Sequence, residues 1–445
     1  MKKIQIDPGA AVLLDALHGA GYAAYAVGGC VRDSLLGLTP HDWDLCTSAR
    51  PEEVLKLFGE QRCIPTGLQH GTVTIKQDGK LYETTTFRTE GRYSDGRHPD
   101  AVHFVPDVRE DLARRDFTIN AMAYSAEEGL IDPFAGQADL AAGVVRAVGE
   151  PERRFEEDAL RILRLYRFAA RFGFVIDPVT GTAASALSAH LNCVSVERIQ
   201  EELLKLLAAP QPGDYLEPAI VGAILPELQP LEHPEAFAEC CRIVDRLPAG
   251  TGNVPARLAA LLLPLGEERA RQALRRLKCS NALIEETAVL VREAGDGSAG
   301  SFSEDRPLGW DPAAAGGRAG DGMARAVSEE KAPGAPDATL YVRRLLGKYG
   351  LVAVERLMAL AAALDPERVS EWEAQAEQAR QMEAAGVCCR IAQLAVNGRD
   401  LMAAGVKPGP GLRKTLEALL EAVITGKVPN EKEALLAEAA RFSAS

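Results

Sequence analysis

The sequence predicts an α+β protein, in which an N-terminal domain built on a β-sheet precedes a long and mostly α-helical part. Short apolar and β-branched runs, separated by glycine-containing turns, occur in the N-terminal part of the chain. Beyond Leu207, apolar residues recur at helical spacing instead. The length of 445 residues exceeds that of one compact domain and indicates about two to four domains.

Composition and charge narrow the class of protein. Hydrophobic residues make up 47% of the chain, which is ample for a core. No apolar run reaches the length of about eighteen residues that a membrane helix needs, so no membrane partner is expected. The net charge of −13 argues against indiscriminate binding to nucleic acid. Any RNA partner must therefore be bound by a local basic patch.

The cysteines and the N-terminal residues predict a cytoplasmic protein. The nine cysteines include no C-x-x-C motif. Two pairs are adjacent in sequence, Cys240 with Cys241 and Cys388 with Cys389, and such pairs are not expected to bridge within regular structure. The first residues, M-K-K-I-Q-I-D-P-G, lack the apolar stretch of a signal peptide. We expect reduced thiols in the cytoplasm; the oligomeric state is open, and a homodimer is possible.

A glycine pair lies between a predicted strand and a predicted helix. The strand is the apolar run Tyr25–Val27, the pair is Gly28 and Gly29, and the helix spans about residues 31–36. Glycines at the mouth of a helix let backbone N–H groups approach a polyphosphate, and the helix dipole favours the anion. A Gly-Gly pair alone, however, is usually just a turn.

Two carboxylates follow on the next predicted strand. Asp42 and Asp44 are two residues apart, so they share one face of the strand while Trp43 and Leu45 face the core. Paired carboxylates suit Mg²⁺, which takes one or two of them and completes its shell with water and phosphate oxygens. A D-x-D motif alone is most often a solvated strand end. After the glycine pair, it predicts a metal site beside a phosphate cradle.

A hairpin is expected further along, after a helix with Pro51 in its first turn. Two β-branched runs lie on either side of Asp78 and Gly79, a pair typical of a tight hairpin turn. On the second strand, the side chain of Glu83 is expected to point to the face opposite to that of its two sequence neighbours. As a third carboxylate it would complete a two-metal site and help to draw the proton from an attacking hydroxyl. A charged residue on a solvated strand face is the equally open alternative.

Residues 88–104 are rich in glycine, charge and turn formers, and such long connections are commonly functional or disordered. The following run E-D-L-A-R-R-D-F-T-I-N-A-M-A-Y predicts a helix. On it, Arg114 and Arg115 can bind phosphate, and Asp116 with Asn120 one turn later shares a face suited to ribose hydroxyls. A plain arginine-rich helix face is the alternative.

A second basic helix is predicted around F-E-E-D-A-L-R-I-L-R-L-Y-R-F. Asp158 and Arg161 are three residues apart and therefore neighbours, and Arg164 and Arg167 continue the basic stripe. A surface salt bridge is the simpler reading. The alternative is base recognition, because a carboxylate beside a guanidinium matches the amino group and ring nitrogen of cytosine and adenine but not uracil or guanine. A buried mismatch costs about 1–3 kcal/mol, so two would discriminate strongly.

The order of these motifs resembles the polymerase-beta-like nucleotidyltransferases and, more specifically, the class II tRNA nucleotidyltransferases, the CCA-adding enzymes. Their bacterial poly(A) polymerase relatives share most of the motifs. The resemblance is carried by G-G-C-V-R-D, D-W-D, E-T-T-T-F-R, R-R-D-F, E-D-A-L-R, the predicted helix V-E-R-I-Q-E-E-L-L-K-L-L and the tail N-G-R-D-L-M-A-A-G-V-K-P-G-P-G-L. It is close over roughly residues 20–210.

The resemblance implies a role for each site residue. Asp42 and Asp44 would bind Mg²⁺, and Asp158 and Arg161 would read the incoming base. Residues 88–104 would correspond to the loop that the family uses to switch from CTP to ATP. The remaining residues would bind the nucleotide: Gly28, Gly29 and Arg32 the triphosphate, Arg114, Arg115 and Asp116 its phosphate and sugar, and Arg164 and Arg167 the base.

The implied activity is template-independent addition and repair of the 3′-terminal CCA of tRNA, using CTP and ATP and releasing pyrophosphate. An A-adding tRNA nucleotidyltransferase or a poly(A) polymerase is the alternative of the same class, and an inactive RNA-binding relative is a more distant one. The apparent completeness of residues 88–104 disfavours a CC-only enzyme, since such relatives are shortened there.

Five segments are predicted along the chain. A catalytic head spans residues 1–145, a helical nucleotide-selecting neck 146–210 and a helical body 211–294. Residues 295–337 form a Gly/Ala/Ser-rich insertion that is expected to be disordered. Residues 338–445 form the rest of the body and a tRNA-binding tail. In that tail Arg413 and Lys414, after a glycine-rich turn, could grip RNA phosphates, although a helix-capping turn is an equal alternative.

Overall fold

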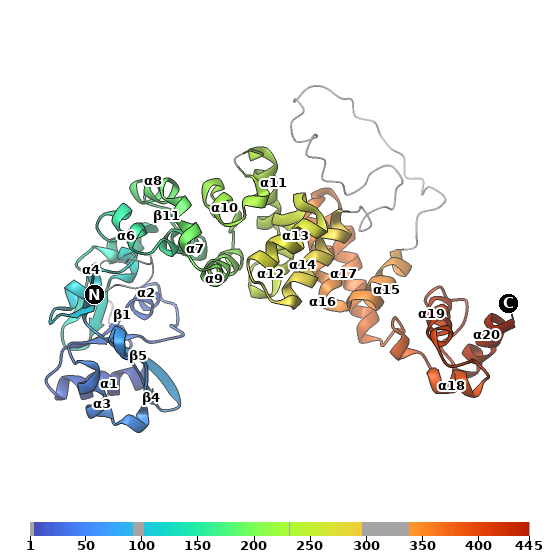
Figure 1. Cartoon of the computed structure of the whole chain (residues 1–445), viewed down its shortest axis with the longest axis horizontal. Helices are drawn as coiled ribbons and strands as arrows, with labels where there is room; N and C mark the ends of the chain where they lie inside the picture. Colours follow the sequence, from blue (N-terminus) through green and yellow to red (C-terminus); the bar gives the residue numbers. More distant parts are fainter. Residues whose placement is uncertain (1–3, 92–101, 231, 296–337, 445) are drawn as a thin grey trace. The chain divides into compact units, whose positions relative to one another are not determined.

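The computed structural model describes residues 4–91, 102–230, 232–295 and 338–444 (Figure 1). The chain divides into two compact units, Met1–Glu232 and His233–Ser445. The first contains a β-sheet followed by helices, and the second is helical in every element described. The predicted fold class is therefore confirmed. The finer division into five segments stays a prediction, and the insertion predicted at 295–337 lies almost wholly outside the described residues.

Seven strands form one sheet in the first unit, in the order β3-β4-β5-β2-β1-β8-β9. β2 and β5 run parallel, and the other neighbours are antiparallel. Asp78 and Gly79 join β4 to β5 with φ angles of 49° and 77°, as a two-residue hairpin turn requires, so the predicted hairpin is confirmed. The strands are β1 (Ala24–Val27), β2 (Leu45–Thr47), β3 (Cys63–Gly67), β4 (Thr72–Gln77), β5 (Lys80–Thr86), β8 (Ala123–Ser125) and β9 (Gly129–Ile131).

Apolar side chains from this sheet and from the helices beside it form a hydrophobic core. Tyr25, Cys46, Phe87 and Leu112 are among its buried members. The helices before residue 146 are short: α1 (Pro8–Gly19), α2 (Gly29–Leu35), α3 (Pro51–Phe58), α4 (Val108–Ala113) and α5 (Gly136–Ala142). Pro51 begins α3, as predicted.

Five helices complete the first unit: α6 (Pro151–Glu157), α7 (Leu160–Phe172), α8 (Pro178–Ala186), α9 (Val196–Leu207) and α10 (Pro218–Ile224). Between α7 and α8, the short strand β11 (Val175–Ile176) pairs in parallel with β10 (Val144–Val145). α7 packs directly against α9, and the bounds of α9 are those that the sequence predicts. This packing brings side chains of α9 to the polar side of α7.

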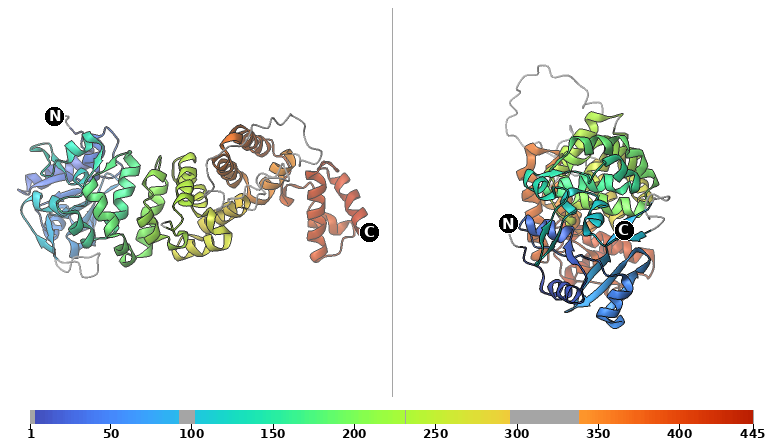
Figure 2. Two further views of the ribbon diagram at one scale, coloured as in Figure 1. Left: turned by 90° about the horizontal axis from the view of Figure 1, so that it is seen from above. Right: turned by 90° about the vertical axis from the view of Figure 1, so that its left-hand side faces the viewer.

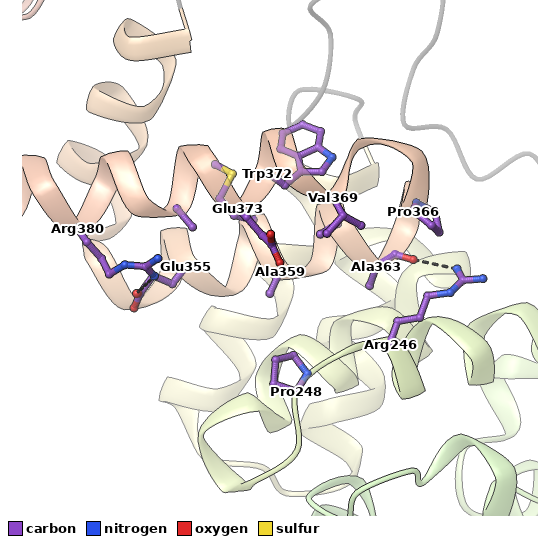
Figure 3. Close-up of a pocket in the computed structure, with 13 residues that line it drawn as sticks. Arg246, Pro248, Glu355, Ala359, Ala363, Pro366, Val369, Trp372, Glu373 and Arg380 are labelled. Carbon is purple, nitrogen blue, oxygen red and sulfur yellow. Dashed lines mark hydrogen bonds and ion pairs between the residues drawn. The ribbon is translucent and has the colours of Figure 1, made fainter.

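The second unit consists of paired helices: α11 (Pro234–Arg246), α12 (Val254–Leu262), α13 (Gly266–Arg276), α14 (Asn281–Gly295), α15 (Ala338–Tyr349), α16 (Leu351–Leu364) and α17 (Val369–Ala384). Figure 3 shows a pocket where α16 and α17 meet the end of α11; Arg380 donates to Glu355 across it, and Arg246 donates to the carbonyl of Ala363. The last three helices, α18 (Gly398–Ala403), α19 (Pro410–Ile424) and α20 (Lys432–Ala444), gather around a core of their own (Figure 2).

The predicted helix around Arg114 is too long. α4 ends at Ala113, and Thr118–Asn120 forms a separate 3₁₀ turn before β8. The backbone of this segment bonds sideways instead of along a helix: Thr118 N–H donates to the Arg146 carbonyl, and Val148 N–H donates to that of Asp116. Tertiary hydrogen bonds therefore replace the helical ones.

Three other local predictions also need correction. β2 begins at Leu45, so Asp42 and Asp44 precede the strand instead of lying on it, although Trp43 and Leu45 are buried as predicted. Asp158 lies in a break between α6 and α7, not within one helix. The ends of the predicted loop 88–104 pair as β6 (Arg88–Glu90) and β7 (Val102–Phe104), and its centre, 92–101, lies outside the described residues.

Candidate active site

Two carboxylates beside the sheet lie close enough to a third, that of Asp44, to influence it electrostatically. β2 pairs with β5 so that Leu45 lies opposite Thr84. The residues one position earlier, Asp44 and Glu83, are therefore neighbours on the opposite face. Burial raises the pKa of Asp44, and the negative charges of Glu83 and Asp42 raise it further, while the Arg115 guanidinium opposes them. The structure thus brings together the two predicted metal ligands and the predicted third carboxylate.

The donor set fits a divalent metal, because hard carboxylate oxygens of like charge crowd one another until a cation neutralises them. Among the described residues, no group of three or more His, Cys, Asp or Glu side chains is close enough to coordinate an ion by itself. A site of one or two carboxylates completed by water and substrate oxygens is the arrangement that Mg²⁺ favours.

The glycine pair adjoins the same carboxylates through Arg115. Gly28 has a φ of 76°, and a Cβ there would lie 2.8 Å from Arg115 Nη1. At Gly29 the nearest atom would be Arg32 Nη2, at an ordinary 3.6 Å. Arg115 Nε is buried and has no hydrogen-bond partner among the residues that the structure describes. A buried donor without a partner is costly, so a positive charge next to Gly28 and Asp44 is available to an anion.

Asp111, which the sequence analysis missed, holds this arginine pair. Its carboxylate accepts from Arg114 Nη2 at 2.8 Å and from Arg115 Nη2 at 3.4 Å, and it is fully buried. Burial would raise the pKa of Asp111, but the two guanidinium groups and a backbone N–H overcome this and lower it. The spacing of three and four residues between Asp111, at the end of α4, and the two arginines that follow the helix is a signal that could have identified it.

A hydrogen-bonded chain runs from Arg32 to α7. Arg32 is buried, its guanidinium stacks on the rings of Phe168 and Phe172, and Nη1 donates to Asn120 Oδ1. Asn120 in turn donates to Asp116 Oδ1 at 3.0 Å, so the two residues meet although they share no helix. Arg32 is bound here by protein side chains, and its predicted phosphate contact stays a prediction.

Asp116 is the centre of that chain. It accepts from Arg164 Nη2 at 2.6 Å and from Arg164 Nε at 2.9 Å. Burial would raise the pKa of Asp116, but the guanidinium of Arg164 and the hydrogen bond from Asn120 hold it well below its usual range. Asp116 is therefore ionised at neutral pH and fixes the position of Arg164.

The predicted pair of Asp158 and Arg161 is separated. Arg161 Nη1 donates to Glu157 Oε2 at 2.8 Å, and Asp158 accepts from Arg198 on α9 at 2.7 Å. The break between α6 and α7 causes this, since Asp158 Oδ1 accepts from the N–H of Leu160 and the aspartate lies outside both helices. The sequence analysis identified neither Glu157 nor Arg198 as a partner. Glu157 lies four residues before Arg161, a spacing that could have indicated the contact, whereas Arg198 is distant from Asp158 in the sequence.

Three family models match parts of this chain. The model of the poly A polymerase head domain matches residues 24–146, that of a probable RNA- and SrmB-binding site of polymerase A matches 173–230, and that of a putative tRNA nucleotidyltransferase domain 2 matches 343–439. The CCA-adding enzyme of Limosilactobacillus fermentum is 37% identical over 432 residues, covering 95% of this chain and 94% of its own.

Similarity extends to solved structures. A crystal structure of the Bacillus stearothermophilus CCA-adding enzyme in complex with CTP superposes with a TM-score of 0.75 at 31% identity, covering 99% of this chain and 98% of its own. The Thermotoga maritima CCA-adding enzyme complexed with tRNA, at 20% identity and a TM-score of 0.65, shares the fold over 99% of this chain and 98% of its own. On its sequence, its fold and the residues gathered beside the sheet, this chain belongs to the family of CCA-adding enzymes.

Proposed function

We propose that this protein adds and repairs the 3′-terminal CCA of tRNA, using CTP and ATP and releasing pyrophosphate. The observation that carries the proposal is the placement of Asp44 beside Glu83, with the Arg115 guanidinium near both Asp44 and Gly28 and its Nε lacking a partner among the described residues. Nucleotidyl transfer needs a metal site next to a triphosphate site, and this arrangement supplies carboxylates and a cation side by side. Full-length similarity to CCA-adding enzymes supports the same reaction.

Family membership implies a divalent metal, and we propose Mg²⁺ held by Asp42 and Asp44. Bound there, it would activate the attacking 3′ hydroxyl and neutralise charge on the transferred phosphoryl group. Glu83 is placed to add a third carboxylate or to accept the proton of that hydroxyl. Arg115, Gly28 and Gly29 would hold the triphosphate, with Arg114 and Asp111 fixing the direction of the guanidinium.

Base selection is assigned to the polar end of α7. The Asp158 carboxylate would accept from the amino group of cytosine or adenine, and Arg161 would donate to the adjacent ring nitrogen. Uracil and guanine present a carbonyl and an N–H in those places, so both contacts fail. Asp116 and Asn120 would position the sugar, with Arg164 and Arg167 behind the base.

The rest of the chain is assigned more coarsely. Arg413, whose side chain is 82% exposed and paired with Glu417, lies near the start of α19 with Lys414 and could contact RNA phosphate. All nine cysteines, each within the described residues, are free thiols, in keeping with a reducing cytoplasm. No helix among the described residues is long and apolar enough to cross a membrane.

The test is single-turnover incorporation of labelled CTP and ATP, with Mg²⁺, into tRNA transcripts ending just before CCA, after C and after CC. Ordered addition that stops after the terminal A is expected. Extension of the CC-ended transcript alone would indicate an A-adding enzyme, and a growing A tail on any RNA would indicate a poly(A) polymerase. Asp44→Asn should lower the rate more than about a hundredfold, whereas Asp78→Asn, at the exposed hairpin turn, should not.

A further inference from the structure

Helix α9 presents an arginine and a glutamate to α7, one turn apart. Arg198 donates to Asp158 through both terminal nitrogens, with Nη2 2.7 Å from Oδ2 and Nη1 3.2 Å from Oδ1. Four residues on, the buried Glu202 accepts from Arg167 Nε and lies 3.9 Å from Arg164 Nη1. Each charged group that faces the base site from α7 or its preceding break thus has a partner of opposite charge behind it.

We propose that Arg198 is a specificity-determining positioning residue: by clamping the carboxylate of Asp158 it leaves one oxygen position to read the amino group of CTP or ATP. The proposal rests on the base-reading role given to Asp158 under the proposed function. It concerns a residue that touches no substrate and acts only through Asp158.

The hydrogen-bond capacity of Asp158 defines that position. A carboxylate offers about four lone-pair sites, two on each oxygen. Oδ1 accepts from the N–H of Leu160 at 3.1 Å and from Arg198 Nη1, which fills both of its sites. Oδ2 accepts from Arg198 Nη2, which leaves one site. The clamped carboxylate can therefore accept one further hydrogen bond, through Oδ2.

Arg161 is prepared in the matching way. Of its five N–H donors, Nη1 uses two, on the Arg154 carbonyl and on Glu157 Oε2, and Nη2 uses one, on the Arg114 carbonyl. The N–H of Nε and one on Nη2 are left. The spacing of Asp158 and Arg161 predicts that they pair with each other. In such a pair, the acceptor oxygen of Asp158 and the N–H donor of Arg161 would bind one another, and neither would be available to a base.

Clamping also explains how a wrong base would be rejected. A free carboxylate could rotate away from the uracil 4-carbonyl and leave room for a bridging water. Held at both oxygens by a bidentate guanidinium, Asp158 cannot turn without losing those hydrogen bonds. The uracil carbonyl then faces a fixed acceptor, so discrimination depends on Arg198, whose guanidinium holds that acceptor in place.

The experiment compares kcat and KM for CTP, ATP and UTP on the transcript ending before CCA, using the full-length protein. Arg198→Gln removes the charge and the bidentate geometry, and Arg198→Lys keeps only the charge. Lys205→Gln is the matched control, because Lys205 is exposed on the same helix and pairs with Glu201. The CTP-to-UTP ratio of kcat/KM is measured within one sample, so it does not depend on the fraction of each variant that folds.

With Arg198→Gln we expect the CTP-to-UTP ratio to fall about tenfold or more, through a higher KM for CTP and little change in kcat. Arg198→Lys should recover part of the ratio and Lys205→Gln should leave it unchanged. Loss of rate with an unchanged ratio would overturn the proposal and make Arg198 merely structural.

Asp158→Asn separates this inference from the function on which it rests. If Asp158→Asn collapses the ratio and Arg198→Gln does not, base reading by Asp158 stands and the clamp is wrong. If neither variant changes the ratio, base reading by Asp158 itself fails. In the double variant, the effect of Arg198→Gln on the ratio should disappear, since the clamp then has no carboxylate to hold.

Discussion

Gly28 and Gly29 differ sharply as single residues, although they are identical in sequence. The backbone of Gly28 is left-handed, and its N–H already donates to the Met122 carbonyl at 3.1 Å. Its missing side chain is also the space that Arg115 Nη1 occupies. Gly29 has neither constraint and begins α2 with room around it. The pair therefore contains one position that must be glycine and one that need not be.

Gly28→Ala should consequently be far more damaging than Gly29→Ala. The strained φ costs about 1–2 kcal/mol, and the new Cβ must push the guanidinium of Arg115 away from its present place. We expect a lower melting temperature and a KM for CTP raised at least about tenfold. Thermal unfolding and steady-state kinetics of both variants measure this, and equal effects at the two positions would contradict it.

At the scale of elements, the parallel pairing of β2 with β5 decides where Glu83 lies. A shift of one residue in that register would turn Glu83 to the other face and away from Asp44. The observed register of β2 and β5 is therefore sufficient to place a third carboxylate at the site. Glu83 is itself exposed, so both the third carboxylate and the solvated glutamate stay open predictions.

Glu83→Gln should lower kcat about a hundredfold while leaving the KM for CTP nearly unchanged, because the change affects the reacting groups and not the base or sugar contacts. Leu81→Gln is the matched control: Leu81 lies two residues earlier on the same face of β5 and is 60% exposed. Single-turnover rates at saturating CTP give the comparison. Full activity of Glu83→Gln would return Glu83 to the role of a surface charge.

At the scale of the whole first unit, Asp116 joins the sheet region to α7 and makes the stability of the fold depend on pH. Its pKa is lowered in the folded state, so the stability that it contributes is present above its unfolded pKa of about 3.9 and is lost as the pH falls through the folded value. Arg164 is the main partner whose charge produces this.

Asp116→Asn should therefore reduce the free energy of unfolding at pH 7 by roughly 3 kcal/mol, the lower end for a buried pair that loses one partner. The difference from the wild type should narrow below about pH 4, where the Asp116 carboxylate of the unfolded chain begins to take up its proton while that of the folded chain stays ionised. Urea unfolding between pH 3 and pH 7 tests this. Asp15→Asn, exposed on α1, should follow the wild-type profile throughout.

The sequence by itself determined the fold class, the hairpin at Asp78 and Gly79, the bounds of α9 and the family, because turn chemistry, periodicity and motif order are local properties. It also singled out Asp42, Asp44, Arg115 and Asp116 by residue type and spacing, and their roles stay predictions. What it placed wrongly were boundaries, such as the extension of the helix from Ala113 to Asn120.

Only the tertiary structure decided which charged side chains are partners. The spacing of Asp158 and Arg161 predicts that they pair, yet each is held by another residue, Arg198 from α9 and Glu157 from α6. Likewise the parallel pairing of β2 with β5 is what places Glu83 near Asp44. Helical spacing describes neighbours along one element, whereas packing between elements brings distant charges together, and burial makes those contacts outweigh the local ones.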